Sequence, residues 1–134
     1  MKNIPYGNAN FYEIRNDDYI YIDRTSYIRT LEKMKITRPL FIRPRRFGKS
    51  LWLNILSNYY DVAKKDQFEF LFGELDIGKN PTSDHNKYIV INWNFSRISP
   101  RGTTDDIEAK MNNTLNNMME VGLVYYSNFL QKVI

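Results

Sequence analysis

The chain has 134 residues, of which 43% are hydrophobic, 25% charged and 15% aromatic, the composition of an ordinary globular domain. It contains no cysteine and one histidine, His85. This excludes disulfide bonds, cysteine-based zinc sites and cysteine nucleophiles, and it argues against a multi-histidine metal site. No apolar run approaches the roughly 20 residues needed to cross a bilayer, and the N-terminus has no apolar signal core. We expect an intracellular protein, cytoplasmic or nuclear, with no membrane partner.

The net charge of +4 comes from one part of the chain. Seven basic residues and no acidic residue lie between positions 33 and 60, whereas the rest of the chain carries 12 basic and 15 acidic residues. A local cluster of this kind predicts a local anion such as phosphate, more than a long nucleic-acid track. The basic residues are Lys33, Lys35, Arg38, Arg43, Arg45, Arg46 and Lys49.

The first predicted elements are a loop, a short strand and a helix. Residues 6–18 are polar and predict a loop, and residues 19–22 form a short β-prone run. Asp23 is placed to cap a helix that runs to about residue 35. The apolar face of this helix is predicted to consist of Tyr27, Ile28, Leu31 and Met34.

The middle of the chain predicts a second strand and a buried helix. Residues 40–42 are a brief apolar run typical of a buried strand. Residues 51–60 are apolar nearly all round and predict a helix buried on more than one side. Residues 68–75 predict a short amphipathic turn, and residues 78–86 a loop. His85 lies in this loop and is expected to be solvated.

A third strand and a long helix are predicted after this loop. Residues 88–91 form a β-prone run that Trp93 and Phe95 extend, and both rings are expected in the core. Asp105 is placed to cap the helix, with Glu108 completing a capping box. The order of elements predicts an α/β protein with a partly parallel sheet. The inward face of the long helix is expected to contain Ile107, Met111, Leu115, Met118 and Gly122.

The strongest chemical signal is the run 43–50, between a predicted strand and a predicted helix. The general phosphate-binding pattern is G-x-x-x-x-G-K-[ST], and Arg43 stands at the position of its first glycine. Gly48 lets the backbone approach an anion closely, and the start of the helix offers unpaired N–H groups. Lys49 can reach a β- or γ-phosphate, and the Ser50 hydroxyl can ligate Mg²⁺.

The same run carries a resemblance to a known family. Its residues are Arg43, Pro44, Arg45, Arg46, Phe47, Gly48, Lys49 and Ser50. This string resembles the RPRRFGK[ST] phosphate-binding loop (P-loop, or Walker A motif) of an AAA-ATPase-like family, in which the first glycine is ordinarily replaced in this way. Flanking segments resemble the same family in the same order, at residues 4–7, 21–25, 68–75 and 88–96.

The resemblance implies a P-loop NTPase-like three-layer fold with a mainly parallel sheet, often N-terminal to a PD-(D/E)XK nuclease-like domain. It implies ATP and Mg²⁺ as cofactors, bound by residues 43–50. The chain then reads as the N-terminal part of an AAA-ATPase-like domain. Residues 1–37 form its N-terminal segment and helix, and residues 38–134 its P-loop strand, helix, second strand and long helix. We expect contact with the remainder of a longer protein, or self-association.

No catalytic residue is assigned from the sequence. Asp105 and Asp106 follow turn residues and no apolar strand, so they are interpreted as a helix N-terminus and not as the Walker B carboxylates that hydrolysis requires. Asp23 is interpreted as a helix cap, with a position beside the nucleotide as the alternative. The chain is therefore expected to bind ATP weakly and to hydrolyse it slowly or not at all. Two other hypotheses remain, a nucleic-acid-binding module that uses the basic cluster of residues 33–49, and an inactive fragment.

Overall fold

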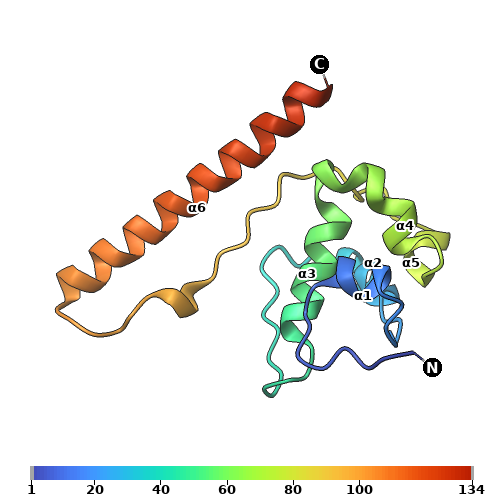
Figure 1. Cartoon of the computed structure of the whole chain (residues 1–134), viewed down its shortest axis with the longest axis horizontal. Helices are drawn as coiled ribbons and strands as arrows, with labels where there is room; N and C mark the ends of the chain where they lie inside the picture. Colours follow the sequence, from blue (N-terminus) through green and yellow to red (C-terminus); the bar gives the residue numbers. More distant parts are fainter. Residues whose placement is uncertain (1, 134) are drawn as a thin grey trace. The chain divides into compact units, whose positions relative to one another are not determined.

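The computed structural model describes residues 2–133 of the chain, which divides into two compact units, Met1–Tyr88 and Ile89–Ile134. Figure 1 shows the helices of each unit. The first unit contains α1 (Phe11–Asn16), α2 (Ser26–Lys33), α3 (Lys49–Tyr60), the 3-10 helix η1 (Val62–Gln67), α4 (Phe68–Phe72) and α5 (Asp76–Lys79). The second unit contains the 3-10 turn η2 (Phe95–Arg97) and the long helix α6 (Thr104–Val133).

The predicted α/β fold with a mainly parallel sheet is wrong, because the described residues contain no β-strand. Their β-pairing is an isolated parallel bridge between Asp61 and Tyr88. Alternating or apolar runs predict an extended backbone, but a strand also needs a hydrogen-bonded neighbour, and parallel neighbours come from distant crossover connections. Within the described part of the chain, the three runs expected to be strands, residues 19–22, 40–42 and 88–95, form no ladder of this kind, and Tyr88 alone of them takes part in the isolated bridge.

Aromatic rings form the centre of the first unit. Phe72 of α4 lies 5.2 Å from Phe11 of α1 and 5.4 Å from Tyr59 of α3, measured between ring centroids. All three side chains are fully buried, and ring pairs at this spacing stabilise a core beyond their buried area by about 0.5–1.5 kcal/mol. The buried core cluster consists of Phe11, Ile28, Ile55, Tyr59, Leu71, Phe72, Leu75 and Ile77.

Helix α1 fixes the N-terminal segment against α3. The Asn10 side chain accepts hydrogen bonds from the backbone N–H groups of Tyr12 and Glu13, which caps the helix. The backbone N–H of Phe11 donates to the Asn54 side-chain oxygen of α3 at 2.8 Å. The sequence predicts only a loop over residues 6–18. This six-residue helix was missed because its stability comes from the cap and from burial of Phe11, not from a long periodic pattern.

Helix α2 lies within the predicted range but starts later and buries less. It begins at Ser26, and the N-cap residue, Thr25, makes no side-chain capping bond. Asp23 is thus not the N-cap, and its carboxylate instead accepts from the backbone N–H groups of Thr25 and Asp76 at 2.8 and 2.7 Å. Ile28 is fully buried as predicted. The two ends of the expected apolar face are wrong, because Tyr27 and Met34 are 56% and 60% exposed.

The helix predicted over residues 51–60 is confirmed as α3. It buries Ile55 and Tyr59, whereas Leu53 is 55% exposed. At its C-terminal end the Tyr60 hydroxyl donates to Glu32 of α2 at 2.9 Å, and Thr82 donates to the same oxygen. Burial, followed by the adjacent Glu32 carboxylate, raises the pKa of Tyr60. The phenol therefore stays protonated and keeps α3 bonded to α2.

The predicted solvated position of His85 is wrong. Its ring is half-buried, with the centroid 4.7 Å from that of Phe68. Its Nδ1 lies 2.7 Å from the Thr82 carbonyl oxygen. The polar residues around His85 predict a loop correctly, but that loop packs back against the aromatic core, and local composition does not predict such packing.

In the second unit, α6 confirms the predicted long helix. The capping box is formed by Thr103 and Asp106, not by the predicted Asp105 and Glu108. The Asp106 carboxylate accepts from the Thr103 N–H at 2.9 Å, and the Thr103 hydroxyl accepts from the Asp106 N–H at 3.2 Å. The bonds that the Thr103 N–H and then the Thr103 hydroxyl donate to the carboxylate lower the pKa of Asp106. Both registers place a capping residue three positions before a carboxylate, so the sequence alone does not distinguish them.

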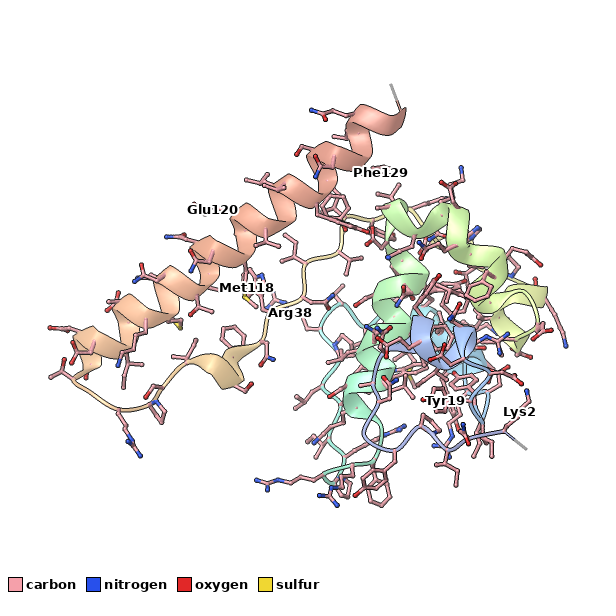
Figure 2. All side chains as sticks on the ribbon, viewed as in Figure 1. Lys2, Tyr19, Arg38, Met118, Glu120 and Phe129 are labelled. Atoms are coloured by element: carbon pink, nitrogen blue, oxygen red, sulfur yellow. The ribbon has the colours of Figure 1, made fainter. Side chains whose placement is uncertain are left out.

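One face of α6 packs against the extended segment 89–94. The Tyr126 hydroxyl donates to the Val90 carbonyl oxygen at 3.2 Å and lies 2.6 Å from the Val90 N–H, which donates to it. Figure 2 shows Met118 and Phe129, both half-buried, on the side of α6 that faces this segment, while exposed Glu120 points away. Trp93 and Phe95 were expected in the core, but they are 49% and 53% exposed.

Among the described residues, no helix is both long enough and apolar enough to cross a membrane. The exposed apolar residues of α6 include Val121, Leu123 and Val124, and polar residues separate them from the other apolar positions along the helix.

Candidate functional site

The residues of the predicted site, 43–50, form the loop before α3 and its first turn. The backbone alternates in hand here, because Arg46 and Gly48 have φ values of +66° and +74° while Phe47 between them lies outside the left-handed region. Lys49 then enters the α-helix. Alternation between right- and left-handed backbone is the pattern in which successive N–H groups can form a concave anion-binding nest.

The positive φ of Arg46 is a strained feature that the sequence did not reveal. A residue with a Cβ is disfavoured there by about 1–2 kcal/mol. Such strain persists where surrounding contacts impose it, and it gathers at binding and catalytic loops. One such contact is a long hydrogen bond of 3.5 Å from the Arg46 guanidinium to the Tyr6 hydroxyl.

Lys49 closes the loop on itself. Its ammonium Nζ donates to the backbone carbonyl oxygen of Arg43 at 2.6 Å, six positions earlier in the chain. The cation is therefore held over the loop by the carbonyl of the first loop residue, while the residue remains exposed to solvent. A cation in this position can be transferred to an anion seated in the loop without rearranging the backbone.

The N-terminus of α3 has no capping group of its own. Its N-cap is Gly48, which has no side chain, and the first turn contains no acidic residue. The first N–H groups of a twelve-residue helix and the positive end of its dipole therefore stand open beside the loop. The Ser50 hydroxyl is exposed in this first turn.

The basic cluster is not neutralised by the ion pairs of the structure. Within the described residues, the ion pairs join Lys2 to Asp18, Arg15 to Glu74 and Arg29 to Asp76. The side chains of the basic residues from position 33 to 49 are all exposed. Their positive field thus remains available to an anion from solution. The described residues contain no group of three or more His, Asp or Glu side chains able to hold a metal ion.

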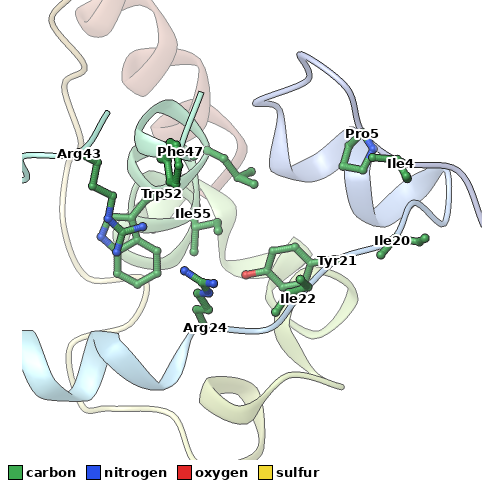
Figure 3. A pocket seen from close by; sticks show the side chains of 12 residues that line it. Ile4, Pro5, Ile20, Tyr21, Ile22, Arg24, Arg43, Phe47, Trp52 and Ile55 are labelled. Carbon is green, nitrogen blue, oxygen red and sulfur yellow. The ribbon is translucent and has the colours of Figure 1, made fainter. Parts of the chain in front are cut away.

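A cavity of about 430 Å³ opens beside Gly48 (Figure 3). Three segments that are distant in sequence form it, namely the N-terminal residues, the extended segment before α2, and the loop with the first two turns of α3. Its surface is mainly aliphatic and aromatic. The lining residues are Ile4, Pro5, Ile20, Tyr21, Ile22, Arg24, Arg43, Phe47, Gly48, Leu51, Trp52 and Ile55.

The polar groups of this cavity include Tyr21 and Arg24. Burial, followed by the nearby Asp23 carboxylate, raises the pKa of Tyr21 to about 12, so its phenol remains a hydrogen-bond donor at neutral pH. Figure 3 shows the Tyr21 hydroxyl and the Arg24 guanidinium pointing toward one another. Asp23 does not line the cavity, because its carboxylate is bonded to Thr25 and Asp76.

The structure places the contiguous run 43–50 at the start of a helix, as predicted, but within the described residues no strand precedes it. Neighbours that the sequence did not indicate also lie beside the run. The added residues, from the segments 4–5 and 20–24, line a cavity with Gly48. The available signal was the pair of flanking matches at residues 4–7 and 21–25. Those matches suggested importance but not contact with the loop.

The open surroundings of Gly48 allow a prediction about the loop backbone. A Cβ at Gly48 or at Gly122 would meet no atom within 4 Å, but only Gly48 has a positive φ. We expect Gly48→Ala to destabilise the fold by about 1–2 kcal/mol through backbone strain. Gly122→Ala, within α6, is expected to stabilise by about 0.5–1 kcal/mol. Urea unfolding followed by circular dichroism measures both, and equal signs would contradict the left-handed assignment.

Comparisons with known proteins identify a family and a curated relative. A family model described as "Predicted AAA-ATPase" matches residues 5–131. An "Uncharacterized protein in vnfD 5'region" from Azotobacter chroococcum mcd 1 is 42% identical over 60 residues. That alignment covers 44% of this chain and 11% of the relative, so the chain spans a small part of the relative's length. No solved structure matches the chain significantly.

Proposed function

Because the chain belongs to the predicted AAA-ATPase family, we propose that residues 43–50 form a phosphate-binding loop for ATP. The observation that carries this proposal is the hydrogen bond from the Lys49 ammonium to the Arg43 carbonyl oxygen. It holds the cation over a loop in which left-handed residues, Arg46 and Gly48, flank Phe47. A concave set of N–H groups, an open helix N-terminus and an ordered cation together suit a triphosphate.

Each residue of the loop has a distinct proposed role. Gly48 supports the close approach of the backbone to the phosphates, because its position demands a positive φ and leaves space free. Lys49 binds the β- and γ-phosphates, and Arg45 and Arg46 add charge-assisted hydrogen bonds from exposed positions. Pro44 and Phe47 complete the loop but bring no charge to the phosphates.

Magnesium fits this site as a partner of the nucleotide. Mg²⁺ in phosphate sites is held by few protein oxygens, together with phosphate oxygens and water. Ser50, exposed in the first turn of α3, is the proposed protein ligand. When bound, the ion would neutralise phosphate charge.

We propose slow hydrolysis for this chain. Hydrolysis requires a carboxylate that positions the metal and the attacking water. Asp106 is occupied by Thr103 at the start of α6, and Asp105 lies beside it in the same helical turn. We therefore assign neither carboxylate to the metal and water of the phosphate-binding loop. The proposed activity is ATP binding and not efficient ATP hydrolysis.

The proposal is tested by thermal unfolding of the chain with and without Mg-ATP. At 100 times the dissociation constant, ATP is expected to stabilise the fold by about 2.7 kcal/mol, which is several degrees in Tm for a domain of this size. Lys49→Ala is expected to abolish the shift. Lys33→Ala removes an equal charge from the same basic cluster outside the loop, and is expected to retain it. No shift in the parent chain, or an equal loss in both variants, would overturn the proposal.

A nucleic-acid-binding module is the second candidate, favoured by the exposed and unneutralised basic residues of positions 33–49. Binding through several phosphates falls steeply with salt. A labelled oligonucleotide distinguishes the candidates, because binding that weakens steeply between 50 and 200 mM salt and ignores ATP would support this candidate. Oligonucleotide displacement by Mg-ATP would instead place both ligands at the loop.

A further inference from the structure

The cavity beside Gly48 is suited to the flat ring of a nucleotide base. It shares Arg43, Phe47 and Gly48 with the proposed phosphate loop, so one ligand can reach both. Its volume of about 430 Å³ lies within the range of about 300–1,000 Å³ that small-molecule sites occupy. A ligand that combines an anionic chain with an apolar ring matches this continuous arrangement.

The cavity wall favours stacking. The rings of Tyr21, Phe47 and Trp52 line it, together with aliphatic side chains. Tyr21 and Trp52 are half-buried and so are held in place by their neighbours, whereas Phe47 is 64% exposed. Stacking of a base on aromatic rings is worth about 1–3 kcal/mol and depends little on which base it is, because every base presents a π face.

The polar groups of the lining do not distinguish adenine from guanine. Selection of guanine needs acceptors for its ring N–H and amino groups, and selection of adenine needs a group that both donates and accepts, such as a carboxamide. The lining side chains include no Asp, Glu, Asn or Gln. The Tyr21 hydroxyl also lines the cavity, and because it can either donate or accept a hydrogen bond, it suits the polar edge of either purine. The guanidinium groups of Arg24 and Arg43 only donate, and both purines offer N7 as an acceptor.

We propose that this cavity receives the base of the bound nucleotide and accepts adenine and guanine alike, which makes purine nucleoside triphosphates in general the ligand class. This inference rests on the proposed phosphate loop. A site whose ring contacts are mainly apolar discriminates weakly between ligands of similar shape, whereas strong rejection requires buried polar groups left unpaired by the wrong ligand.

The test is thermal unfolding of the full chain with Mg²⁺ and increasing concentrations of ATP, GTP or inorganic tripolyphosphate, because the stabilisation at each concentration gives the dissociation constant. ATP and GTP are expected to bind within about threefold of each other. Tripolyphosphate, which has the phosphates but no base, is expected to bind at least about tenfold more weakly, as the loss of one stacked base predicts. A difference of tenfold or more between ATP and GTP would overturn the shared-base assignment.

A cavity-filling variant tests the location. Ile22 lines the cavity and is 71% exposed, so Ile22→Trp is expected to fold and to weaken ATP binding about tenfold while leaving tripolyphosphate binding unchanged. Ile36→Trp, at a half-exposed position outside the lining, is the matched control. If Ile22→Trp fails to fold, Ile4→Trp, at another exposed position of the lining, replaces it.

The failures are separable. If neither ATP nor tripolyphosphate binds, or if binding does not depend on Lys49, the phosphate loop is wrong and the base site fails with it. If tripolyphosphate binds as tightly as ATP and Ile22→Trp changes neither, the phosphate loop stands and the base site alone is overturned.

Discussion

Replacing Phe72 by alanine is expected to lower the free energy of unfolding of the first unit by about 3–5 kcal/mol. Phe72 is fully buried, and its ring contacts Phe11, Tyr59 and Phe68 at centroid distances of 5.2, 5.4 and 5.4 Å. Removing it takes away a shared partner of three rings and leaves a cavity that short helices cannot readily close. Because domains are stable by only about 5–15 kcal/mol, this loss removes a large share of the unit's stability.

Phe70→Ala is the matched control, since it removes the same side chain from the same helix, α4. Phe70 is 48% exposed and contacts Tyr12 at 5.6 Å, so its loss is expected to cost about 1 kcal/mol. Urea unfolding followed by far-ultraviolet circular dichroism measures both variants. Similar losses for the two would show that Phe72 is not the centre of the core.

Asp23→Ala is expected to destabilise the first unit by about 3 kcal/mol, because it leaves several donors without an acceptor. The Asp23 carboxylate accepts from the Thr25 N–H and hydroxyl at 2.8 and 2.7 Å, and from the Asp76 N–H at 2.7 Å. Thr25 is fully buried, and its hydroxyl oxygen also accepts from the Ile77 N–H at 3.2 Å. One carboxylate thus joins the start of α2 to α5.

Two variants separate this role from a general effect of charge. Asp23→Asn retains one acceptor oxygen and is expected to cost about half as much as Asp23→Ala. Asp66→Ala removes an exposed carboxylate from η1 and is expected to change stability by less than about 0.5 kcal/mol. Thermal unfolding monitored by circular dichroism ranks the stabilities of the three variants. An Asp23→Ala effect no larger than that of Asp66→Ala would contradict the role of Asp23 in linking α2 to α5.

Helices were predictable where their signal was local. The apolar run that became α3 and the long periodic segment that became α6 were both identified. The predicted sheet was wrong. An alternating pattern indicates that a single segment has an extended backbone, whereas strand pairing depends on a partner segment elsewhere in the chain. The run 40–42 illustrates the point, since it is apolar enough for a buried strand, yet Leu40 and Ile42 are 82% and 84% exposed.

The smaller errors have the same origin. The capping box of α6 was predicted two residues out of register, because Thr103 and Asp105 are both acceptable caps and only the structure shows that Asp106 bonds Thr103. His85 was predicted to be solvated from its polar neighbours, but tertiary packing sets it against Phe68. Neither choice is encoded within a few residues.

The candidate site divides in the same way. The run 43–50 is contiguous, so its glycine, lysine and serine could be named from their order alone, and the structure sets them at the start of α3. The cavity could not be predicted, because its walls come from residues 4–5 and 20–24 as well as from α3. Its formation depends on α1, which holds the N-terminal segment through the bond from Phe11 to Asn54.

The contact between Lys49 and the Arg43 carbonyl has a thermodynamic consequence for any anion that enters the loop. Ordering a lysine side chain costs up to about 2 kcal/mol of rotamer entropy, and here folding has already fixed it. To bind an anion, the ammonium must give up its short hydrogen bond to the Arg43 carbonyl oxygen. The enthalpy lost with that bond cancels much of the enthalpy gained from the bond to the anion. Association should therefore release little heat and should be driven largely by water and counterions returned to the solvent.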